Sequence, residues 1–568
     1  MDLDNIEVTT QGLDHLGLVS AVARELGIVE KLDARLTVSH KNGAVVTMGE
    51  RVLAMMLNGL GFLNDRLYMV SSFFETKPVS RLIAEHVKAE HLNDDALGRC
   101  LDAIHNYGTT KLFSEIAFEI GLEQKVLGKN AHLDTTSLSV VGEYADDDVD
   151  DAPMITFGYS KDHRRDLKQI ILSLTTTGKA GFPIWMEALD GNSSDKTSFH
   201  ETLRKMTAFQ EQLKEAPSFI FVADSALYTP EKLLSTPHLL FITRVPETIK
   251  EAKLLCQLPK EKLFWTELQD GYKMSNFGSL HGGIKQRWQL IFSEQAFKRE
   301  QKTLVKKIAM EKEKLDKQLW RAGNQMYTCE LDAKTAAKAL LKGLKYHTIV
   351  HTVDVVKKYD QSGKQKKGVL PKIVGYHISG KSEQDAEQIS KKETTLGRFI
   401  LATNELDYEH LADDALLKEY KQQSQVESGF RFIKDPCFQV SSVFLKSPHR
   451  IEALMMIMTL CLMVYNMAQF YLRKALKTNN DTVPNQSGKP VQNPTSRWIF
   501  RMMLDVAVVQ MKIGDVIIRE VITNLNADTR KIIRYFGKHA MRIYDVPPLA
   551  RSERENSFRL FIPSLMQI

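Results

Sequence analysis

Cysteine is scarce in this chain of 568 residues, and its spacing excludes two kinds of scaffold. The cysteines form no Cys-x-x-Cys pair and have no nearby histidine at metal-ligand spacing. A disulfide framework or a zinc site requires such clusters. We therefore expect free thiols and a reducing, cytoplasmic setting. The cysteines are Cys100, Cys256, Cys329, Cys437 and Cys461.

The sequence also lacks a clear targeting or membrane segment. Its first residues, MDLDNIEVTTQGLDHLG, have neither a basic lead nor an apolar core, so we expect no secretory signal. One apolar stretch, from Ala453 to Leu472, contains polar residues and follows charged ones, which favours a buried core helix and no membrane partner. These residues are Thr459, Asn466 and Gln469 within the stretch, and Arg450 and Glu452 before it.

A strong net charge is absent as well. The formal charge of +6 permits a polyanionic partner without demanding one. The length is sufficient for roughly three to four domains of ~150 residues each. We expect four regions, at 1–125, 126–244 together with 401–440, 245–400, and 441–568.

The first 125 or so residues show apolar residues at helical spacing, for example over 18–32, 48–62 and 97–104. Asn93, Asp94 and Asp95 offer N-cap chemistry for the last of these helices. Such a helical region is compatible with a DNA-reading helix-turn-helix that binds a DNA end. It is equally compatible with a helical bundle that packs on another domain.

From Lys129 the pattern changes to strands, predicted over 131–141, 169–175, 182–189, 218–224 and 238–243. A helix is predicted between the third and fourth strands. This order is typical of an α/β fold of ribonuclease H type. Asp134 lies within the first strand, and Asp224 ends the fourth, nearly all-apolar strand. The acidic run 146–151 resembles a cation site, but a solvated loop is the safer interpretation.

The interval 245–400 is predicted to be a β-rich insertion that contains a charged helix over 294–321. A lysine-rich tract crosses its later part. Such a tract is usually a soluble loop, but in a DNA-handling protein it would form a phosphate track. Its lysines are Lys357, Lys358, Lys364, Lys366, Lys367, Lys372 and Lys381.

A regular spacing surrounds Glu427, which follows Tyr420 by seven residues and precedes Lys434 by seven more. On a helix, steps of seven return to nearly the same face. The spacing therefore predicts a phenol, a carboxylate and an ammonium along one stripe. The alternative is a solvated helix with a chance spacing.

Two aspartates and a glutamate brought to one point would repel one another unless divalent cations neutralised them. Hard oxygen ligands select Mg²⁺ or Mn²⁺. Two such ions about 4 Å apart can activate a water or a 3′-hydroxyl and stabilise the leaving oxygen of a phosphodiester. Asp134, Asp224 and Glu427 are thus predicted catalytic metal ligands, with Lys434 and Tyr420 as phosphate contacts.

The chain resembles bacterial insertion-sequence transposases of family four, in the branch designated sixteen-thirty-four. That family carries a Tyr-x2-Arg-x3-Glu-x6-Lys signature, whose positions hold Tyr420, Gln423, Glu427 and Lys434 here. Gln423 replaces the arginine, so a charged bidentate phosphate contact is exchanged for neutral hydrogen bonds. The resemblance spans roughly residues 90–450. It includes the segments Asp134-Thr-Thr-Ser, Gly158-Tyr-Ser-Lys-Asp-His163-Arg-Arg-Asp-Leu-Lys168-Gln, Gly191-Asn-Ser-Ser-Asp-Lys-Thr-Ser-Phe and Ala223-Asp224-Ser-Ala-Leu.

The resemblance implies a cut-and-paste enzyme on a ribonuclease H-like core that binds the terminal inverted repeats of its own element. It implies two Mg²⁺ or Mn²⁺ ions, DNA-hairpin processing of the transposon end, joining of 3′ ends to target DNA, and a homodimer in a paired-end complex at the bacterial nucleoid. A tryptophan of the insertion stacks on a flipped base in related enzymes. Trp265 and Trp288 are the candidates, although a core tryptophan is the commoner use.

The helical region 441–568 carries no chemical motif, and core support, dimer contact and end binding remain open for it. Two rival functions remain for the whole chain. One is a domesticated, non-catalytic DNA-binding protein, and the other is a stand-alone nuclease of ribonuclease H type.

Overall fold

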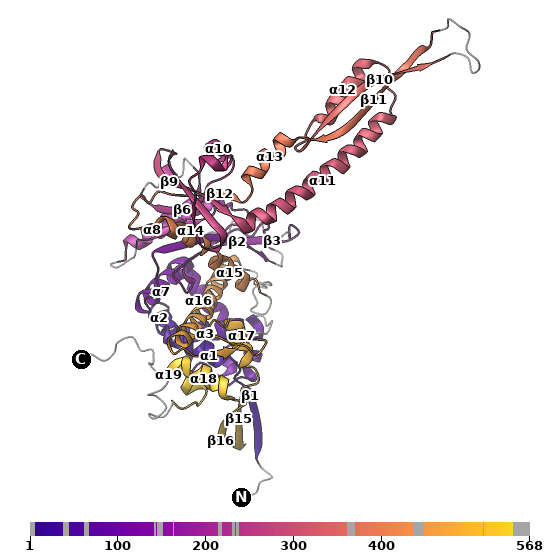
Figure 1. Cartoon of the computed structure of the whole chain (residues 1–568). Coiled ribbons are helices and arrows are strands. Elements are labelled where there is room, and N and C mark those ends of the chain that lie inside the picture. The colour runs from indigo at the N-terminus through magenta and orange to yellow at the C-terminus, as the bar shows by residue number, and fades with distance from the viewer. Residues whose placement is uncertain are drawn as a thin grey trace. The chain divides into compact units, whose positions relative to one another are not determined.

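The computed structural model divides into two compact units (Figure 1), unit 1 comprising residues 1–241 and 418–568 and unit 2 comprising residues 242–417. The acidic run 146–151, His163, Cys437 and three lysines of the tract, at 364, 366 and 367, lie outside the described residues. The described residues are 6–37, 45–61, 67–140, 144, 152–162, 164–213, 218–229, 233–234, 238–359, 370–435, 445, 447–514 and 516–548.

The N-terminal region of unit 1 is mainly helical, as its apolar spacing predicted. Thr47 and Glu50 form a reciprocal capping box at the start of α3, and the Asn93 side chain accepts a hydrogen bond from the Ala96 amide at the start of α6. The elements are β1 (Glu7–Gly12), α1 (Leu16–Glu25), α2 (Ile28–Asp33), α3 (Met48–Gly59), η3 (Leu67–Met69), α4 (Val70–Glu75), α5 (Val79–Leu82), η4 (Ala89–His91), α6 (Asp94–Tyr107) and α7 (Thr109–Glu123).

Helix α16 (Pro448–Thr478) forms the centre of unit 1 (Figure 1). Among the described helices it alone is long and apolar enough to cross a membrane, but 78% of its most apolar window is buried within the protein. It packs against α1, α3, α6, α7 and β4. A helix that is apolar on every side needs this kind of surround, and the predicted core helix is confirmed.

Four strands of unit 1 belong to the sheet in which Asp134 lies and after whose strand β5 Asp224 follows. Their order is β4-β3-β2-β5, with β2, β3 and β4 antiparallel and β5 parallel to β2. The α8 helix (Asp195–Glu211) connects β4 to β5. The expected mixed α/β class is confirmed here. The strands are β2 (Asn130–Val140), β3 (Lys168–Thr177), β4 (Phe182–Leu189) and β5 (Ile220–Ala223).

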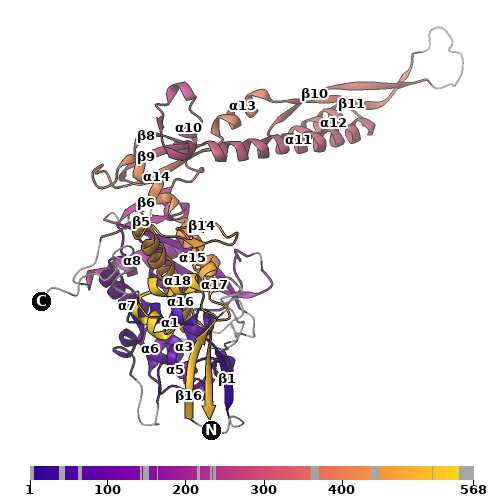
Figure 2. The same cartoon turned by 60° about the horizontal axis from the view of Figure 1, so that its bottom comes forward.

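The C-terminal region is less helical than expected, because residues 507–523 form two strands. The β-branched runs Ala507–Ile513 and Val516–Thr523 pair as a hairpin across Gly514, whose φ is 55°. With β1 they make a three-stranded sheet in the order β1-β15-β16 (Figure 2). The elements are α15 (Ser424–Ile433), β13 (Val483–Pro484), β14 (Pro490–Val491), α17 (Ser496–Met502), β15 (Ala507–Ile513), β16 (Val516–Thr523), α18 (Ala527–Tyr535) and α19 (Gly537–Ile543).

Unit 2 contains strands in the order β6-β12-β9-β8-β7 and a separate β10-β11 ribbon. The predicted charged helix is α11, which packs together with α12 against this ribbon (Figure 1). The elements are β6 (Leu240–Arg244), α10 (Lys250–Cys256), η6 (Lys260–Lys262), β7 (Thr266–Glu267), η7 (Gln269–Gly271), β8 (Tyr272–His281), β9 (Ile284–Ser293), α11 (Glu294–Asn324), α12 (Glu330–Leu341), β10 (His347–Lys358), β11 (Lys372–Gln384), α13 (Ala386–Thr395), β12 (Arg398–Thr403) and α14 (Asp413–Lys421). The unit boundaries fall within β6 and α14.

The cysteines that the structure describes are free, as expected. Cys100 and Cys461 are buried in unit 1, whereas Cys256 is partly buried and Cys329 exposed in unit 2.

Candidate active site

Asp134 lies in the middle of β2, with the ladder of β3 on one side and β5 on the other. Its backbone pairs with Leu174 of β3. One carboxylate oxygen, Oδ1, accepts a hydrogen bond of 2.7 Å from the Thr135 amide. The side chain is 19% exposed, so it opens to solvent from an otherwise buried strand.

Asp224 follows directly after β5. The parallel register ends with the pair His132 and Val222, and each aspartate lies two residues further along the chain. Neighbouring strands are about 4.7–4.9 Å apart, and side chains two residues apart face the same side. The Asp224 carboxylate also caps the short helix η5 (Ser225–Leu227), accepting a 2.8 Å bond from the Ala226 amide. The parallel pairing of β2 with β5 thus ends two residues before both aspartates.

Glu427 lies in the first turn of α15 and is exposed. The opposite face of α15 is buried and packs against β2, β3 and α16. At Gly429 a side chain would have little room, since a Cβ atom there would lie 3.0 Å from Leu462 and 3.5 Å from Leu174. Leu174 is the residue that pairs with Asp134. The helix is thus held against the strand position beside the first aspartate.

The predicted stripe on one continuous helix is wrong, because the chain turns between α14 and α15. Tyr420 lies in α14, while Lys434 is the C-cap of α15. In the turn, the backbone N–H of Gln423 donates to the backbone carbonyl of Tyr420 at 3.1 Å. The backbone N–H of Val426 donates to the backbone carbonyl of Gln423 at 3.0 Å. These bonds span three residues, which tightens the backbone and breaks the seven-residue phase.

Gln423, at the position of the missing arginine, is buried with 9% of its surface exposed. A DNA contact from the side-chain amide of Gln423 would require the turn to open. Tyr420 is partly buried and keeps a solvent-facing portion.

Lys434 pairs with a residue of the Gly158–Gln169 motif. Its Nζ donates to Asp162 Oδ2 at 2.6 Å, and the Lys434 side chain is 23% exposed. Lys161 precedes Asp162 in the chain, and its Nζ donates to the backbone carbonyl of Thr135 at 2.7 Å. The same Nζ lies 3.9 Å from Asp134 Oδ1. This motif therefore connects the strand of the first aspartate to the end of the glutamate helix.

Lys161 and Asp162 are functional candidates that the sequence interpretation left without a role. The signal was present, since both belong to a motif that supports the resemblance. His132, on the same strand, is buried, and burial lowers its pKa to about 4, so its imidazole is neutral near pH 7.

The two tryptophans of unit 2 have different surroundings. Trp288 is 1% exposed, and its Nε1–H donates to Gln286 at 3.1 Å, which places it in the core. Trp265 is partly buried, with the Arg398 guanidinium 5.8 Å from its ring centroid. Its neighbour Phe264 is 93% exposed. Only Trp265 of the two retains surface for stacking without a rearrangement of β9.

The carboxylates have the donor chemistry that Mg²⁺ or Mn²⁺ prefers. The ammonium of Lys161 near Asp134 shows that this position accommodates a positive charge. Among the described residues, however, no group of three or more His, Cys, Asp and Glu side chains is gathered closely enough to hold a metal ion. Asp134 and Asp224 each follow the paired residues of β2 and β5 by two positions, and Glu427 is exposed on α15.

Residues 133–466 match the family described as Transposase DDE domain, a segment that covers more than half of the chain and contains all three carboxylates. The chain belongs to this family. It is a DDE transposase and acts in DNA transposition, with DNA as its partner. Residues 8–118 match a second family, described as Domain of unknown function (DUF4277).

A comparison with curated proteins finds no match for this transposase. Among solved structures it is similar to a chain described as "Cryo-EM structure of piggyBac transposase synaptic complex with hairpin DNA (SNHP)". The identity is 9% and the TM-score 0.35, over 96% of this chain and 87% of that chain. A likeness this distant transfers no residue's role.

Proposed function

We propose that this protein is the transposase of an insertion sequence, of family four and the sixteen-thirty-four branch. It cuts DNA at the terminal inverted repeats of its element and joins the 3′ ends to target DNA. The observation that supports the proposal is the parallel pairing of β2 with β5, which ends at His132 and Val222, two residues before Asp134 and Asp224. The packing of α15 on the same strands supports Glu427 as the third ligand.

Asp134, Asp224 and Glu427 would hold two Mg²⁺ or Mn²⁺ ions on this ribonuclease H-like core. When bound, such ions activate the attacking oxygen and stabilise the leaving oxygen of a phosphodiester. Closure of the ligand set requires the exposed Glu427 side chain to turn toward the sheet edge, since the described structure does not gather the three carboxylates.

The remaining residues of the site handle phosphate. Lys161 is placed beside Asp134, so its ammonium would contact the phosphate that undergoes attack. Lys434 and Tyr420 are proposed to contact flanking phosphates, with Lys434 released from Asp162 by the DNA. In unit 2, Trp265 is the better candidate for stacking on a flipped base. The described lysines of the tract, including the cross-strand pair Lys358 and Lys372, fit a phosphate track.

The proposed reaction has four steps. Water attacks the phosphorus at the transposon end and releases a 3′-hydroxyl. That hydroxyl attacks the opposite strand, forming a hairpin as the bond to flanking DNA breaks, and a second water reopens the hairpin. The freed 3′-hydroxyl then attacks a phosphorus of target DNA, and the bond to the target's own 3′-oxygen breaks and leaves a 3′-hydroxyl there. We propose a homodimer in a paired-end complex, in the bacterial cytoplasm at the nucleoid.

The test is a linear DNA that carries the inverted repeats flanking the gene, incubated with the full chain and Mg²⁺. We expect nicked, hairpin and joined products. Binding without cleavage would instead identify a domesticated DNA-binding protein. Cleavage without a hairpin or joined product would identify a stand-alone nuclease.

A further inference from the structure

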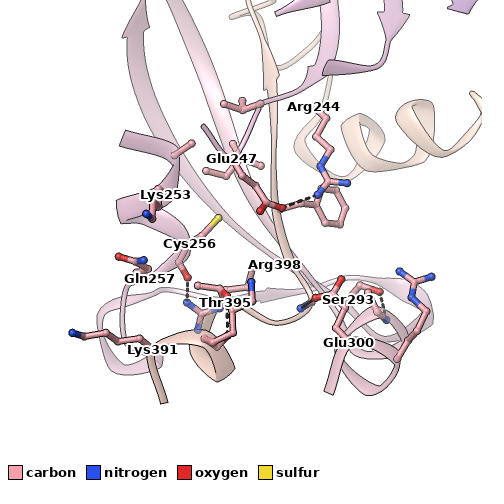
Figure 3. Close-up of a pocket in the computed structure, with 18 of the residues that line it drawn as sticks. Arg244, Glu247, Lys253, Cys256, Gln257, Ser293, Glu300, Lys391, Thr395 and Arg398 are labelled. Carbon is pink, nitrogen blue, oxygen red and sulfur yellow. Dashed lines mark hydrogen bonds and ion pairs between the residues drawn. The ribbon is translucent and has the colours of Figure 1, made fainter. Parts of the chain in front are cut away.

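Unit 2 contains a cavity of about 750 Å³ that the proposed chemistry does not use (Figure 3). Its walls come from α10, the first turns of α11, α13, and the ends of β6 and β12. The volume lies within the ~300–1,000 Å³ typical of ligand sites. All the lining residues belong to unit 2.

The lining is strongly cationic, with seven lysine or arginine side chains and two carboxylates. Arg244 and Arg398 stand at the ends of β6 and β12. The lysines and the third arginine are supplied by α10, α11, α13 and the segment before β10. They are Lys253, Arg299, Lys345, Lys391 and Lys392.

Both carboxylates of the lining already have partners. Glu247 pairs with Arg244 at 3.3 Å, as Figure 3 shows. Glu300 accepts a 2.9 Å hydrogen bond from the Gly397 amide. Gly397 has a φ of 69°, and a Cβ there would lie 2.7 Å from the Ser293 carbonyl, so this turn requires glycine. With seven cations against these two acids, the lining keeps an excess of positive charge.

Arg398 is the most constrained of the cations. It is 6% exposed, and its Nη1 donates to the carbonyls of Cys256 at 3.0 Å and Leu258 at 2.6 Å. Within the described part of the chain it pairs with no carboxylate. Burial lowers the pKa of its guanidinium, because the charged form is partly desolvated. A buried charge of this kind is usually paired, so its surroundings favour an anion.

Four exposed cations around the cavity also lack a carboxylate partner among the described residues. They are Lys253, Arg299, Lys345 and Lys392. The Cys256 thiol in the wall is no nucleophile, since burial raises its pKa to about 11. The cavity therefore offers positive charge and hydrogen-bond donors but no evident reactive group.

We propose that this cavity binds consecutive phosphate groups of a DNA strand. This assignment rests on the proposed function, because the transposase must hold a DNA strand beyond the carboxylates that cut it. Arginine and lysine neutralise phosphates, and single-stranded DNA is bound in cationic grooves of this kind. The cavity is a phosphate-binding site of unit 2, separate in residues from the proposed active site.

The test uses the full chain carrying Asp134→Asn and Asp224→Asn, so that binding is measured without cleavage. The cavity variant adds Lys253→Gln, Lys345→Gln and Lys392→Gln. The control variant adds Lys306→Gln, Lys307→Gln and Lys314→Gln, which removes the same charge from exposed positions of α11 that do not line the cavity. Thermal unfolding first establishes that both variants are folded.

Binding of a labelled single-stranded oligonucleotide is then measured by fluorescence anisotropy over a series of salt concentrations. We expect the cavity variant to bind about tenfold more weakly and the slope of log K against log salt to fall by about two. The control variant should match its parent. Equal affinity and equal slopes for the two variants would overturn the proposal.

A second arm titrates a nucleoside monophosphate alone. Cavity-dependent binding of that small molecule, with oligonucleotide binding the same in both variants, would assign the site to a free nucleotide and overturn the DNA assignment. Since every measurement uses a cleavage-deficient protein, failure of the wild-type chain to cut DNA leaves this test unaffected.

Discussion

Asp134 lies in the middle of an 11-residue strand that pairs on both edges, whereas Glu427 lies in the first turn of a 10-residue helix that follows a tight turn. The backbone ladder with β3 fixes β2 at Asp134, while β5 pairs with β2 up to His132 and ends just before Asp224. The helix position depends on side chains, since α15 is held by its buried face against Leu174 and Leu462.

The two parts of the site are therefore held in position by different interactions. Backbone hydrogen bonds with β3 fix the position of Asp134 in a way that does not depend on individual side chains. Packing of a helix face leaves the glutamate sensitive to single methyl groups. We therefore expect substitutions near Glu427 to alter activity through position, and substitutions near the aspartates to alter it through charge.

Removal of a proposed metal ligand should have the largest effect on cleavage, both for the two aspartates and for the glutamate on α15. Asp134→Asn, Asp224→Asn and Glu427→Gln should each lower Mg²⁺-dependent cleavage by about a thousandfold or more, because each removes a metal-binding charge. Binding to the transposon end should persist, since DNA contacts remain. Gel assays of cleavage and of binding measure the two effects.

Asp166→Asn is the matched control for these substitutions. Asp166 is an exposed carboxylate of unit 1 that pairs with Arg164 at 2.8 Å. The Asp166→Asn variant should cleave DNA at the parental rate. Substantial cleavage by any one triad variant would remove that residue from the ligand set.

Substitution of Lys161, which is not a proposed metal ligand, tests whether a positive charge beside Asp134 contributes to cleavage. We expect Lys161→Met to lower the cleavage rate about ten- to a hundredfold, because an ammonium beside Asp134 would no longer stabilise the phosphate. Lys161→Arg should recover part of the rate. Single-turnover kinetics with saturating DNA would show the loss in the rate of the chemical step.

Lys179→Met provides the control, since Lys179 is exposed in the turn between β3 and β4. If Lys161 had a purely structural role, its loss would lower the unfolding temperature, because the bonds to Thr135 would be lost. Lys161→Arg would then recover the unfolding temperature and the cleavage rate together.

The sequence predicted the strand side of the site better than the helix side. Apolar β-branched runs locate β2 and β5, and an acid at the end of such a run is expected to reach the sheet edge. The break between α14 and α15 has no comparable signal, because Lys421, Gln422 and Gln423 are compatible with an uninterrupted helix. Hydrogen bonds that span three residues create the turn there.

Distant partners explain the other differences. Asp162 meets Lys434 across 272 residues of sequence, which no local spacing can reveal. β15 pairs with β1 from the start of the chain and with β16 on its other side, and this pairing overrides the helical expectation for the C-terminal region.

Gly429→Val tests the helix side through volume alone. Its Cβ would lie 3.0 Å from Leu462 and 3.5 Å from Leu174, so the helix must shift or the leucines must move. Overpacking of this kind typically costs about 1–3 kcal/mol in the free energy of unfolding. We expect reduced cleavage and nearly normal end binding, since Glu427 moves while its charge remains.

Ser428→Val is the control, because it introduces the same β-branched side chain on the exposed face of α15. Chemical denaturation of the two variants measures the difference in unfolding free energy. If both lose the same stability, helix propensity rather than packing accounts for the change, and the glutamate helix is not held by its contact with Leu174.

The ion pair between Asp162 and Lys434 should give the smallest effect on stability. Both side chains are partly exposed, at 45% and 23%, so solvent screens their 2.6 Å contact. A double-mutant cycle of Asp162→Asn and Lys434→Met should show a coupling of about 0.2–1 kcal/mol in the unfolding free energy. The same cycle, measured on DNA affinity and on cleavage, separates two roles. If Lys434 leaves Asp162 to bind phosphate, Lys434→Met alone lowers DNA affinity and Asp162→Asn raises it slightly. If the pair instead holds α15 against the strand of Asp134, both single variants slow cleavage equally and the double variant is no slower than either.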